Sequence, residues 1–481
     1  MNTAPQLIAR LEAICGSENV LTHPDALAAY RSDGLAHYRQ MPLAAVLPAT
    51  GDQVRDVVRS CYESQVPWVA RGSGTGLSGG ALPVAEGVLI VLARLRRILS
   101  VNLDDASVLV EPGVSNLAVS RAVAPTHFYP PDPSSQIVCS IGGNVAENSG
   151  GAHCFKYGFT TNYVTGLEVV LSDGTVAELH RDAPGYDLLG AFVGSEGTLG
   201  VATKIELRVV PAPESVRTLL AFFEHTSGAG EAVTAIVSAG IVPAAIEMMD
   251  RLSIRAAEEA TGAGYRLDAG AALIVELDGS EEECATLFEQ VRGMCGDAGG
   301  GGIRVASSER ERDLIWKARK AAFGAMGRVT PAYFVQDGVI PRTRLPQALR
   351  RIEELSGDYG LRVANVFHAG DGNLHPLICY DASVPGEPER AEELANLILR
   401  ACLDLGGSIT GEHGVGVDKK GQMPAMFSES DLEGFHRLRC AFDPHGLANP
   451  GKVMPTPRLC GEVPGPYREH PLERAGVATR L

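Results

Sequence analysis

Two histidines and a glutamate in the C-terminal half of the chain have the types and spacing of metal ligands. His368 and His375 stand in the segment VANVFHAGDGNLHPLICY, on either side of Asp371-Gly372. If this dipeptide is a two-residue hairpin turn, the histidines lie directly opposite each other, with Cβ atoms about 4.5–5.5 Å apart. Their imidazole nitrogens could then bind one divalent ion, with Glu412 as an oxygen ligand. Two histidines and one carboxylate leave coordination positions open, which favours a catalytic site.

His413 follows directly after Glu412 in the segment GEHGVG and is a candidate general base. A neutral imidazole near physiological pH can accept a proton from a hydroxyl group. Two plainer alternatives stay open. His413 could orient Glu412 or a loop carbonyl, and the three proposed ligands could be unrelated polar residues of a surface hairpin and a turn.

Arg319 lies in the helical pattern ERDLIWKARKAAFGAMGR and is a candidate anion-binding residue. Trp316 and Phe323 are three residues before and four residues after it, so the three side chains share one helical face. An arginine on an apolar face either extends its charged end to solvent or holds an anion with paired hydrogen bonds. The helical spacing allows both interpretations.

Three glycine-rich segments lie in the N-terminal half: residues 71–80 (RGSGTGLSGG), 141–151 (IGGNVAENSGG) and 194–200 (GSEGTLG). Glycine lets backbone N–H groups converge on an anion without interference from Cβ atoms. The first segment follows a strand pattern and leads into another strand, so it lacks the helix of a dinucleotide-binding fold, and no GK[ST] of a Walker A motif is present. Three clusters favour a pyrophosphate site over mobile loops or tight turns.

Composition excludes several classes of protein. The 481 residues suggest about three domains, with hydrophobic residues at 45% and a net charge of −16. No run approaches the ~18–20 apolar residues of a membrane-spanning helix, and the acidic balance argues against general nucleic-acid binding. The ten cysteines form no CxxC pair, so a zinc ribbon or a cysteine-bound iron–sulfur cluster has no support. The N-terminus lacks a secretory signal pattern, and we expect a cytoplasmic protein.

Hydrophobic patterns divide the chain into regions. Residues 1–38 have the pattern of short helices, and residues 39–213 that of short apolar strands with turns and few helices. Residues 214–440 alternate longer helices with strands, which predicts a separate α+β domain. Residues 457–481 contain several prolines and no periodicity, and we expect them to be irregular.

Taken in order, the motifs resemble those of the vanillyl-alcohol-oxidase/PCMH family of flavoproteins. The resemblance is greatest to the branch of glycolate oxidase flavin subunits, D-lactate dehydrogenases and D-2-hydroxyglutarate dehydrogenases. It implies an α+β fold: a two-subdomain PCMH-type FAD-binding domain (39–213), a substrate or cap domain with an antiparallel sheet (214–440), and a return segment (441–456). The matching segments are RGSGTGLSGG, PPDPSS, IGGNVAENSGG, VTGLEVVLSDG, GSEGTLGVAT, HAGDGNLHP, GEHGVG and DPHGLANPGK.

The resemblance also implies which residues bind the cofactor. FAD would lie along the glycine-rich segments, with its pyrophosphate in the first and its isoalloxazine facing the second domain. We expect non-covalent FAD because no histidine lies within residues 71–80, although His153 and Cys154 leave a covalent link open. The expected FAD-binding residues are Arg71, Gly72, Ser73, Gly74, Thr75, Gly76, Leu77, Ser78, Gly79, Pro133, Ser134, Gly142, Gly143, Asn144, Asn148, Ser149, Gly150, Gly151, Glu196, Gly197, Gly200 and Asn449.

The activity that the resemblance implies is oxidation of a small 2-hydroxy acid, glycolate or D-lactate, to the 2-oxo acid by hydride transfer to flavin N5. Arg319 would hold the substrate carboxylate and His413 would accept the hydroxyl proton. A divalent ion (Zn, Mn or Fe) at His368, His375 and Glu412 would polarise the substrate oxygens. Electrons would pass to an acceptor other than oxygen. The expected partners are a second flavin-type subunit and an iron–sulfur subunit, through which the protein would attach to the inner membrane.

Departures from the branch narrow the expected substrate. Leu377 stands where the hydroxyglutarate branch has a polar residue, and Phe323 and Val335 stand where it has a threonine and a lysine. Loss of the threonine and lysine removes contacts to a second carboxylate and favours a short monocarboxylate. Three alternatives stay open: a D-lactate or D-2-hydroxyglutarate dehydrogenase acting alone, a non-redox flavin-dependent transferase, and a flavin-binding scaffold without activity.

Overall fold

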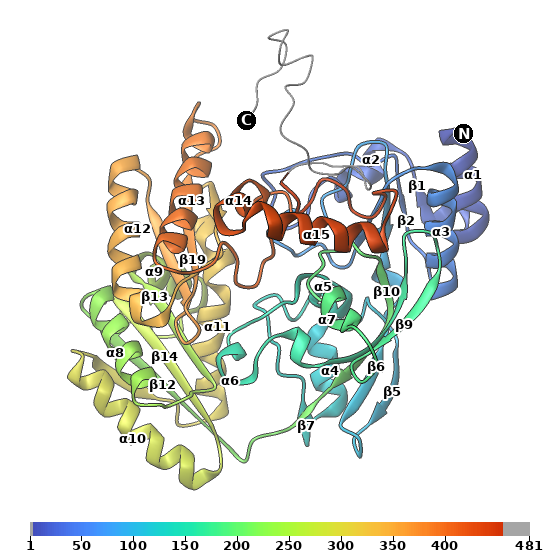
Figure 1. The fold of residues 1–481 in the computed structure, drawn as a ribbon. Helices are drawn as coiled ribbons and strands as arrows, with labels where there is room; N and C mark the ends of the chain where they lie inside the picture. The colour runs from blue at the N-terminus through green and yellow to red at the C-terminus, as the bar shows by residue number, and fades with distance from the viewer. Residues whose placement is uncertain (1–2, 456–481) are drawn as a thin grey trace.

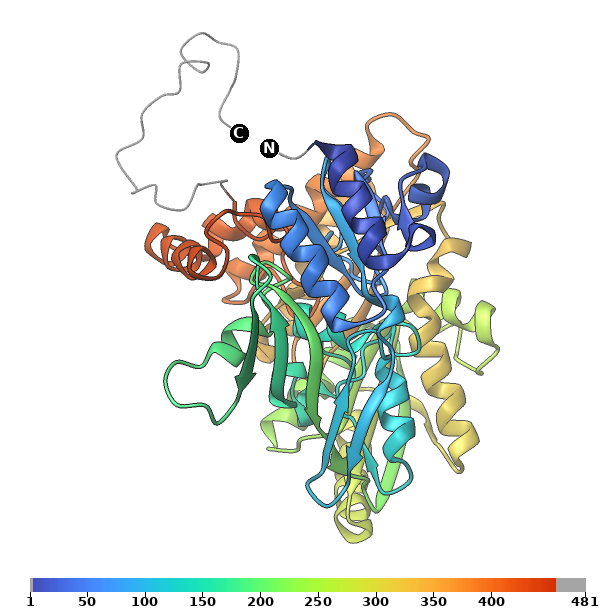
Figure 2. The ribbon, with the colours of Figure 1, turned by 90° about the vertical axis from the view of Figure 1, so that its right-hand side faces the viewer.

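The computed structural model describes residues 3–455, so the tail expected at 457–481 lies outside the described residues. A four-stranded, a five-stranded and an eight-stranded sheet carry most of the fold, with the two-stranded pair β7–β11 beside them. Figure 1 shows the eight-stranded sheet on the left and the four- and five-stranded sheets on the right, and Figure 2 shows the same arrangement from the side. This combination of helices with mainly antiparallel sheets confirms the predicted α+β fold.

The four-stranded sheet has the order β1-β2-β4-β3 and includes the first residues of the chain. The N-terminal segment is therefore part of the first layer: β1 pairs with β2, and Leu7 and Leu11 of α1 join the core that contains Val57 of α3. Helix α3 begins after Thr50, whose hydroxyl accepts a hydrogen bond from the backbone N–H of Gln53. The elements are α1 (Ala4–Cys15), β1 (Val20–Leu21), α2 (Pro24–Leu27), β2 (Ala44–Val46), α3 (Gly51–Ser64), β3 (Trp68–Arg71) and β4 (Val88–Val91).

The five-stranded sheet is antiparallel throughout, with the order β5-β6-β10-β8-β9. The second glycine-rich segment differs from the predicted loop, because residues 141–147 form a short helix, α5, with two glycines in its first turn. The elements of this part are β5 (Ile98–Asn102), β6 (Ser107–Val110), α4 (Asn116–Val123), β7 (His127–Phe128), α5 (Ile141–Glu147), α6 (Cys154–Tyr157), β8 (Val164–Val170), β9 (Val176–His180), α7 (Leu188–Phe192), β10 (Val201–Arg208) and β11 (Val210–Pro211).

The eight-stranded sheet has the order β15-β12-β14-β13-β18-β19-β16, with β17 also paired to β19. Helices cover both faces, and alternate residues of β14 belong to different cores: Leu273 and Val275 to one, Ile274 to the other. The elements are β12 (Ser215–Phe223), α8 (Thr226–Ser238), β13 (Ala245–Asp250), α9 (Arg251–Thr261), β14 (Ala271–Gly279), α10 (Glu281–Asp297), β15 (Gly301–Val305), α11 (Glu309–Ala325), β16 (Ala332–Val335), β17 (Gly338–Val339), α12 (Leu345–Tyr359), β18 (Val363–His368), β19 (Asn373–Tyr380), α13 (Glu387–Asp404), α14 (Met423–Met426) and α15 (Glu429–Phe442).

The hairpin between β18 and β19 forms as expected, but its predicted register is wrong. His368 pairs with Asn373, and His375 pairs with Val366, so the turn spans residues 369–372 instead of Asp371-Gly372 alone. The two histidines are therefore diagonal neighbours, not direct partners. Because side chains alternate with a period of two, this even shift keeps both histidines on one face of the sheet.

The chain after α15 returns to the four-stranded sheet. Helix α15 runs from the eight-stranded sheet toward the N-terminal part (Figure 1). The backbone N–H of Trp68 then donates to Leu447 O at 2.9 Å, and that of Asn449 donates to Trp68 O at 2.8 Å. Residues 447–449 thus lie beside β3, and the division of the chain at 441–456 stays a prediction.

No helix within residues 3–455 is both long enough and apolar enough to cross a bilayer.

Core packing in the eight-stranded sheet gives a stability prediction. Leu273 is fully buried in the central strand β14, whereas Leu438 on α15 is exposed. Leu273→Ala should lower the free energy of unfolding by about 2–5 kcal/mol, because it leaves a cavity that the surrounding side chains fill only in part. Leu438→Ala, the matched control, should change it by less than about 0.5 kcal/mol. Urea titration followed by circular dichroism measures both. Equal midpoints for the two variants would contradict the assigned core.

Candidate active site and cofactor cavity

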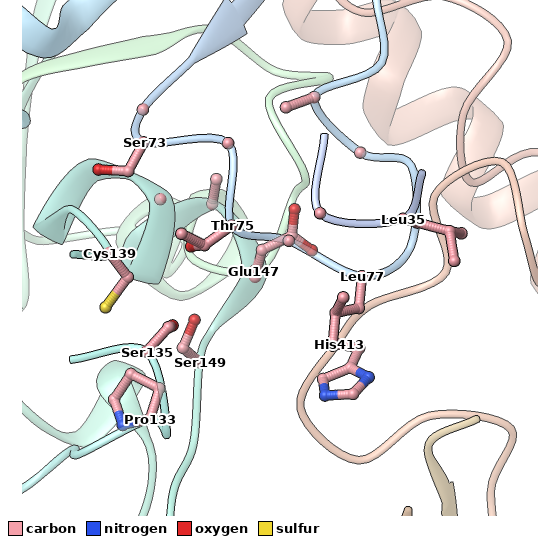
Figure 3. A pocket seen from close by; sticks show the side chains of 18 of the residues that line it. Leu35, Ser73, Thr75, Leu77, Pro133, Ser135, Cys139, Glu147, Ser149 and His413 are labelled. Carbon is pink, nitrogen blue, oxygen red and sulfur yellow. The ribbon is translucent and has the colours of Figure 1, made fainter. Parts of the chain in front are cut away.

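A cavity of about 950 Å³ lies between the N-terminal sheets and the eight-stranded sheet. The first glycine-rich segment and α5 form one wall, and Phe323, Tyr333, Glu412 and His413 belong to the other. Figure 3 shows the ring of His413 below Leu77, with Thr75 and Glu147 nearby. This volume is typical of a site for a large organic ligand.

Most of the predicted cofactor-binding residues line this cavity. The three glycine-rich segments, which are far apart in the sequence, meet there, together with the segment PPDPSS. The predicted residues on the cavity wall are Gly72, Ser73, Gly74, Thr75, Gly76, Leu77, Pro133, Ser134, Gly142, Gly143, Asn144, Ser149, Glu196, Gly197 and Gly200.

The other predicted cofactor residues are not among those that line the cavity, and their contact with a cofactor stays a prediction. The guanidinium of Arg71 donates to Ser32 O at 2.7 Å, and Asn449 Nδ2 donates to Glu196 O at 2.6 Å. Both side chains therefore donate hydrogen bonds to backbone carbonyl oxygens of the protein. The remaining members of this group are Ser78, Gly79, Asn148, Gly150 and Gly151.

The glycines of the wall are needed for close approach of the segments. A Cβ atom on Gly72 would lie 2.1 Å from Ser140 Oγ, and one on Gly142 would lie 2.6 Å from Pro112 Cβ. Gly74 has a φ of +68°, in the left-handed region. Backbone groups can therefore reach a ligand where side chains would block it, which fits an extended cofactor with a pyrophosphate.

The two residues that left a covalent flavin link open, His153 and Cys154, are not among the residues that line the cavity. His153 lies between two carboxylates, with Nδ1 2.9 Å from Asp132 and Nε2 3.2 Å from Glu276. Both of its ring nitrogens are thus engaged in contacts within the protein.

The three predicted metal ligands lie together. The Nε2 atoms of His368 and His375 are 3.2 and 2.9 Å from the same oxygen, Oε1 of Glu412. The two imidazole rings have centroids 5.0 Å apart, and each residue offers one ligand atom within 4.8 Å of the others. Although the hairpin register differs from the prediction, the donor set is the predicted one.

The hydrogen bonding of the cluster fits a metal ion. His375 is fully buried and its Nδ1 has no hydrogen-bond partner; its Nε2 lies 2.9 Å from Glu412 Oε1 without the geometry of a hydrogen bond, and Nδ1 of His413 also lacks a partner. A buried polar atom without a partner costs about 1–3 kcal/mol. Two imidazole nitrogens and one carboxylate oxygen that converge on one point are the donors that Zn²⁺ and related ions prefer.

Glu247 completes the cluster, and the sequence analysis missed it. It lies on β13 directly beside His368, and its Oε1 is 2.7 Å from His368 Nδ1. A carboxylate on one ring nitrogen of a histidine turns the other nitrogen toward a metal. A single acidic residue inside the apolar strand pattern AIEMM was the signal that could have identified it.

Arg319 lies behind the cavity wall. It is buried on α11, and its NH2 is 2.5 Å from Glu247 Oε2. It is not among the lining residues, whereas its neighbours Lys320 and Phe323 are. Its role as the carboxylate anchor stays a prediction.

Charges inside the cluster set its protonation. Burial disfavours the imidazolium form of His368 and the carboxylate form of Glu412. The carboxylates of Glu247 and Glu412 nevertheless raise the pKa of His368 well above its usual value. The histidines in turn hold the pKa of Glu412 well below its usual value, although burial opposes this. Burial lowers the pKa of His413 to about 4, so its imidazole is neutral at physiological pH.

The cavity wall carries apolar and aromatic side chains together with the cation of Lys320. Phe323, Tyr333 and Val335 line it. Leu377 is fully buried beneath this wall, as the strand partner of Val335, and is not a lining residue.

Two family models match the chain. The model described as "FAD binding domain" matches residues 42–180, and the model described as "FAD linked oxidases, C-terminal domain" matches residues 212–453. The second of these alone spans half of the chain. Together they cover the first two glycine-rich segments and the histidine cluster, whereas the third glycine-rich segment (194–200) lies between the two matches.

Known proteins resemble the chain over nearly its whole length. The glycolate oxidase subunit GlcD of Escherichia coli K12 is 50% identical, over 96% of this chain and 94% of that protein. The D-lactate dehydrogenase of Anaerostipes hadrus is 30% identical, over 93% of this chain and 97% of that protein. The solved structure of p-cresol methylhydroxylase with bound substrate superposes with a TM-score of 0.77 at 19% identity, over 93% of this chain and 96% of that one. The chain therefore belongs to the FAD-linked oxidases, with the PCMH-type fold, and is an FAD-dependent oxidoreductase.

Proposed function

We propose that this protein oxidises a small 2-hydroxy acid, glycolate or D-lactate, to the 2-oxo acid with non-covalently bound FAD. One observation carries the proposal: Glu412 and His413 line the same cavity as the glycine-rich cofactor segments. An acid–base group and a predicted metal site therefore face the place where the cofactor fits. The names of the relatives, a glycolate oxidase subunit and a D-lactate dehydrogenase, support the substrate class.

His413 is the proposed base. The reaction removes a hydride from the substrate Cα and a proton from its hydroxyl, and bound FAD supplies the hydride acceptor. The imidazole of His413 lies at the cavity wall, is neutral and has an unpartnered Nδ1, so it can accept the hydroxyl proton.

His368, His375 and Glu412 are the proposed ligands of a divalent ion (Zn, Mn or Fe), which would supply Lewis acidity to the substrate oxygens. Glu247 orients His368 through Nδ1, which leaves Nε2 for the ion. The Nε2 atoms of both histidines lie close to the same oxygen of Glu412, which supports one ion bound by all three residues.

Arg319 is the proposed anchor of the substrate carboxylate; its guanidinium carbon lies 5.9 Å from the ring centroid of Phe323, which lines the cavity. Phe323 and Val335 give a distal carboxylate no polar contact, which favours a short monocarboxylate, although Lys320 also lines the cavity.

Electrons would leave through partner subunits. The E. coli relative is named as a subunit, and the sequence holds no CxxC motif for a cluster of its own. We therefore propose a second flavin-type subunit and an iron–sulfur subunit as acceptors in place of oxygen. The resemblance to D-lactate dehydrogenase favours the second candidate function, a D-lactate dehydrogenase acting alone.

Anaerobic titration of the FAD-loaded protein tests the substrate class. Glycolate and D-lactate should bleach the flavin absorbance, whereas L-lactate and D-2-hydroxyglutarate should do so at least tenfold more slowly, and a chelator should abolish bleaching. D-lactate reacting far better than glycolate would favour the second candidate function. Absence of bleaching with every hydroxy acid would contradict the proposed oxidation.

His368→Ala tests the metal in the mechanism. The variant should lose about 100-fold or more in turnover, because it removes one predicted ligand, while keeping FAD. Steady-state kinetics, metal analysis and the flavin spectrum measure the effect. His225→Ala, an exposed histidine on the surface, is the matched control and should behave as the parent. Near-normal turnover of His368→Ala would remove the metal from the mechanism.

Arg319→Lys tests the carboxylate anchor. A lysine keeps the positive charge beside Glu247 but loses the paired N–H groups, so KM for glycolate should rise about tenfold. Lys320→Gln, at the neighbouring cavity residue, should change KM little. Kinetics on variants with unchanged FAD content measure this. A raised KM for Lys320→Gln alone would assign the anchor to Lys320 instead.

A further inference from the structure

The segment 410–416, here called the site loop, carries both Glu412 and His413. It belongs to no helix or strand, so no ladder of backbone hydrogen bonds holds it. Its backbone N–H groups nevertheless need partners, because the loop is largely shielded from water. Two buried carboxylates, Asp337 and Glu196, supply most of these partners.

Asp337 holds the first half of the site loop. It is fully buried between β16 and β17, and its carboxylate accepts hydrogen bonds from the backbone N–H groups of residues 411–413 at 3.0, 3.2 and 2.9 Å. The hydroxyl of Thr410 donates to it at 2.6 Å, and Lys419 Nζ donates at 3.0 Å. Burial alone would raise the pKa of Asp337, but Lys419 keeps the pKa below its usual value.

Glu196 holds the second half from the other side of the cavity. Its two carboxylate oxygens accept hydrogen bonds from the backbone N–H groups of Val415 and Gly416, both at 2.6 Å. Gly414 lies against the same carboxylate, where a Cβ atom would be 2.8 Å from Oε1. Glu196 belongs to the part of the chain with the cofactor segments, so it joins the site loop to that part.

Apart from the Thr410 hydroxyl, the loop groups that bind these two carboxylates are backbone N–H groups, and the side chains of Glu412 and His413 are not among the hydrogen-bond donors to them. The carboxylate oxygens accept the hydrogen bonds of the loop, and an amide in place of either carboxylate would put its own N–H groups against these donors. Burial raises the pKa of Glu196, against the opposing effect of the N–H groups of Val415 and Gly416 and of Lys419. The donors to Asp337 include the N–H groups of Glu412 and His413 themselves. The direction of these two side chains therefore depends on a buried carboxylate that is not among the residues lining the cavity.

We propose that Asp337 and Glu196 are positioning residues of the site loop: Asp337 sets Glu412 and His413 against the histidine cluster, and Glu196 ties the loop to the cofactor-binding part. The expected effect of these two residues on metal binding rests on the proposed function. Their expected effect on the backbone hydrogen bonds of the site loop is independent of it.

The test compares three variants of the FAD-loaded full chain: Asp337→Asn, Glu196→Gln and, as control, Asp250→Asn. Asp250 is also a buried acceptor of several hydrogen bonds, but its partners are Ser253 and Asn365, outside the loop. Two readouts are needed. Zn²⁺ affinity is measured by competition with a chromophoric chelator, and amide hydrogen exchange in residues 410–416 is measured by mass spectrometry with fragmentation. The flavin spectrum confirms that the cofactor is retained.

Asp337→Asn should weaken Zn²⁺ binding about 10–100-fold and speed exchange at residues 411–413. Glu196→Gln should speed exchange at residues 415 and 416, with a smaller loss of Zn²⁺ affinity, because these residues lie beyond Glu412. Asp250→Asn should change neither readout. The proposal would be overturned if Asp337→Asn changed neither amide exchange in the site loop nor Zn²⁺ affinity. It would also be overturned if Asp250→Asn changed both readouts as much as Asp337→Asn does. A parent protein that binds no Zn²⁺, with exchange still faster in Asp337→Asn, would overturn the metal site and support the positioning role.

Discussion

The site depends on ionised carboxylates held in the interior of the protein. Taking an isolated charge out of water costs several kcal/mol, so each such group needs charged or N–H partners. Glu247 has His368 and Arg319, Glu412 has the histidines of the cluster, and Asp337 has a lysine and three backbone N–H groups. Each of these partners either belongs to the proposed site or holds a residue that does. The contacts that neutralise the buried carboxylates are therefore the same contacts that position the proposed site residues.

The sheet determines which face carries these groups. Glu247, His368 and His375 alternate with residues of the larger core and so point to the face covered by α9 and α11. Arg319 comes to the same face from α11 and pairs with Glu247 there. The apolar helical face predicted for Arg319 is correct, but its contact is an internal carboxylate, since burial of the guanidinium requires a partner that the helix itself does not provide.

The two halves of the molecule meet through charged contacts on either side of the cavity. His153 joins Asp132 of the N-terminal part to Glu276 of the eight-stranded sheet, and Glu196 binds the site loop. The interface that borders the cavity therefore also holds the loop with the proposed base, His413.

The order of glycine-rich and histidine-rich motifs was enough to predict the fold family and to group residues 368, 375 and 412, which lie together; their binding of a metal ion stays a prediction. The face of the hairpin was predictable because side chains alternate with a period of two, which survives an even shift of register. The register itself depends on the turn and on neighbouring strands, so it was missed. Glu247 and Asp337 were missed because their partners are about 70 to 120 residues away in the sequence. Residue types and periodicity are local properties of a chain, whereas the pairing of buried charges is decided only when distant strands become neighbours.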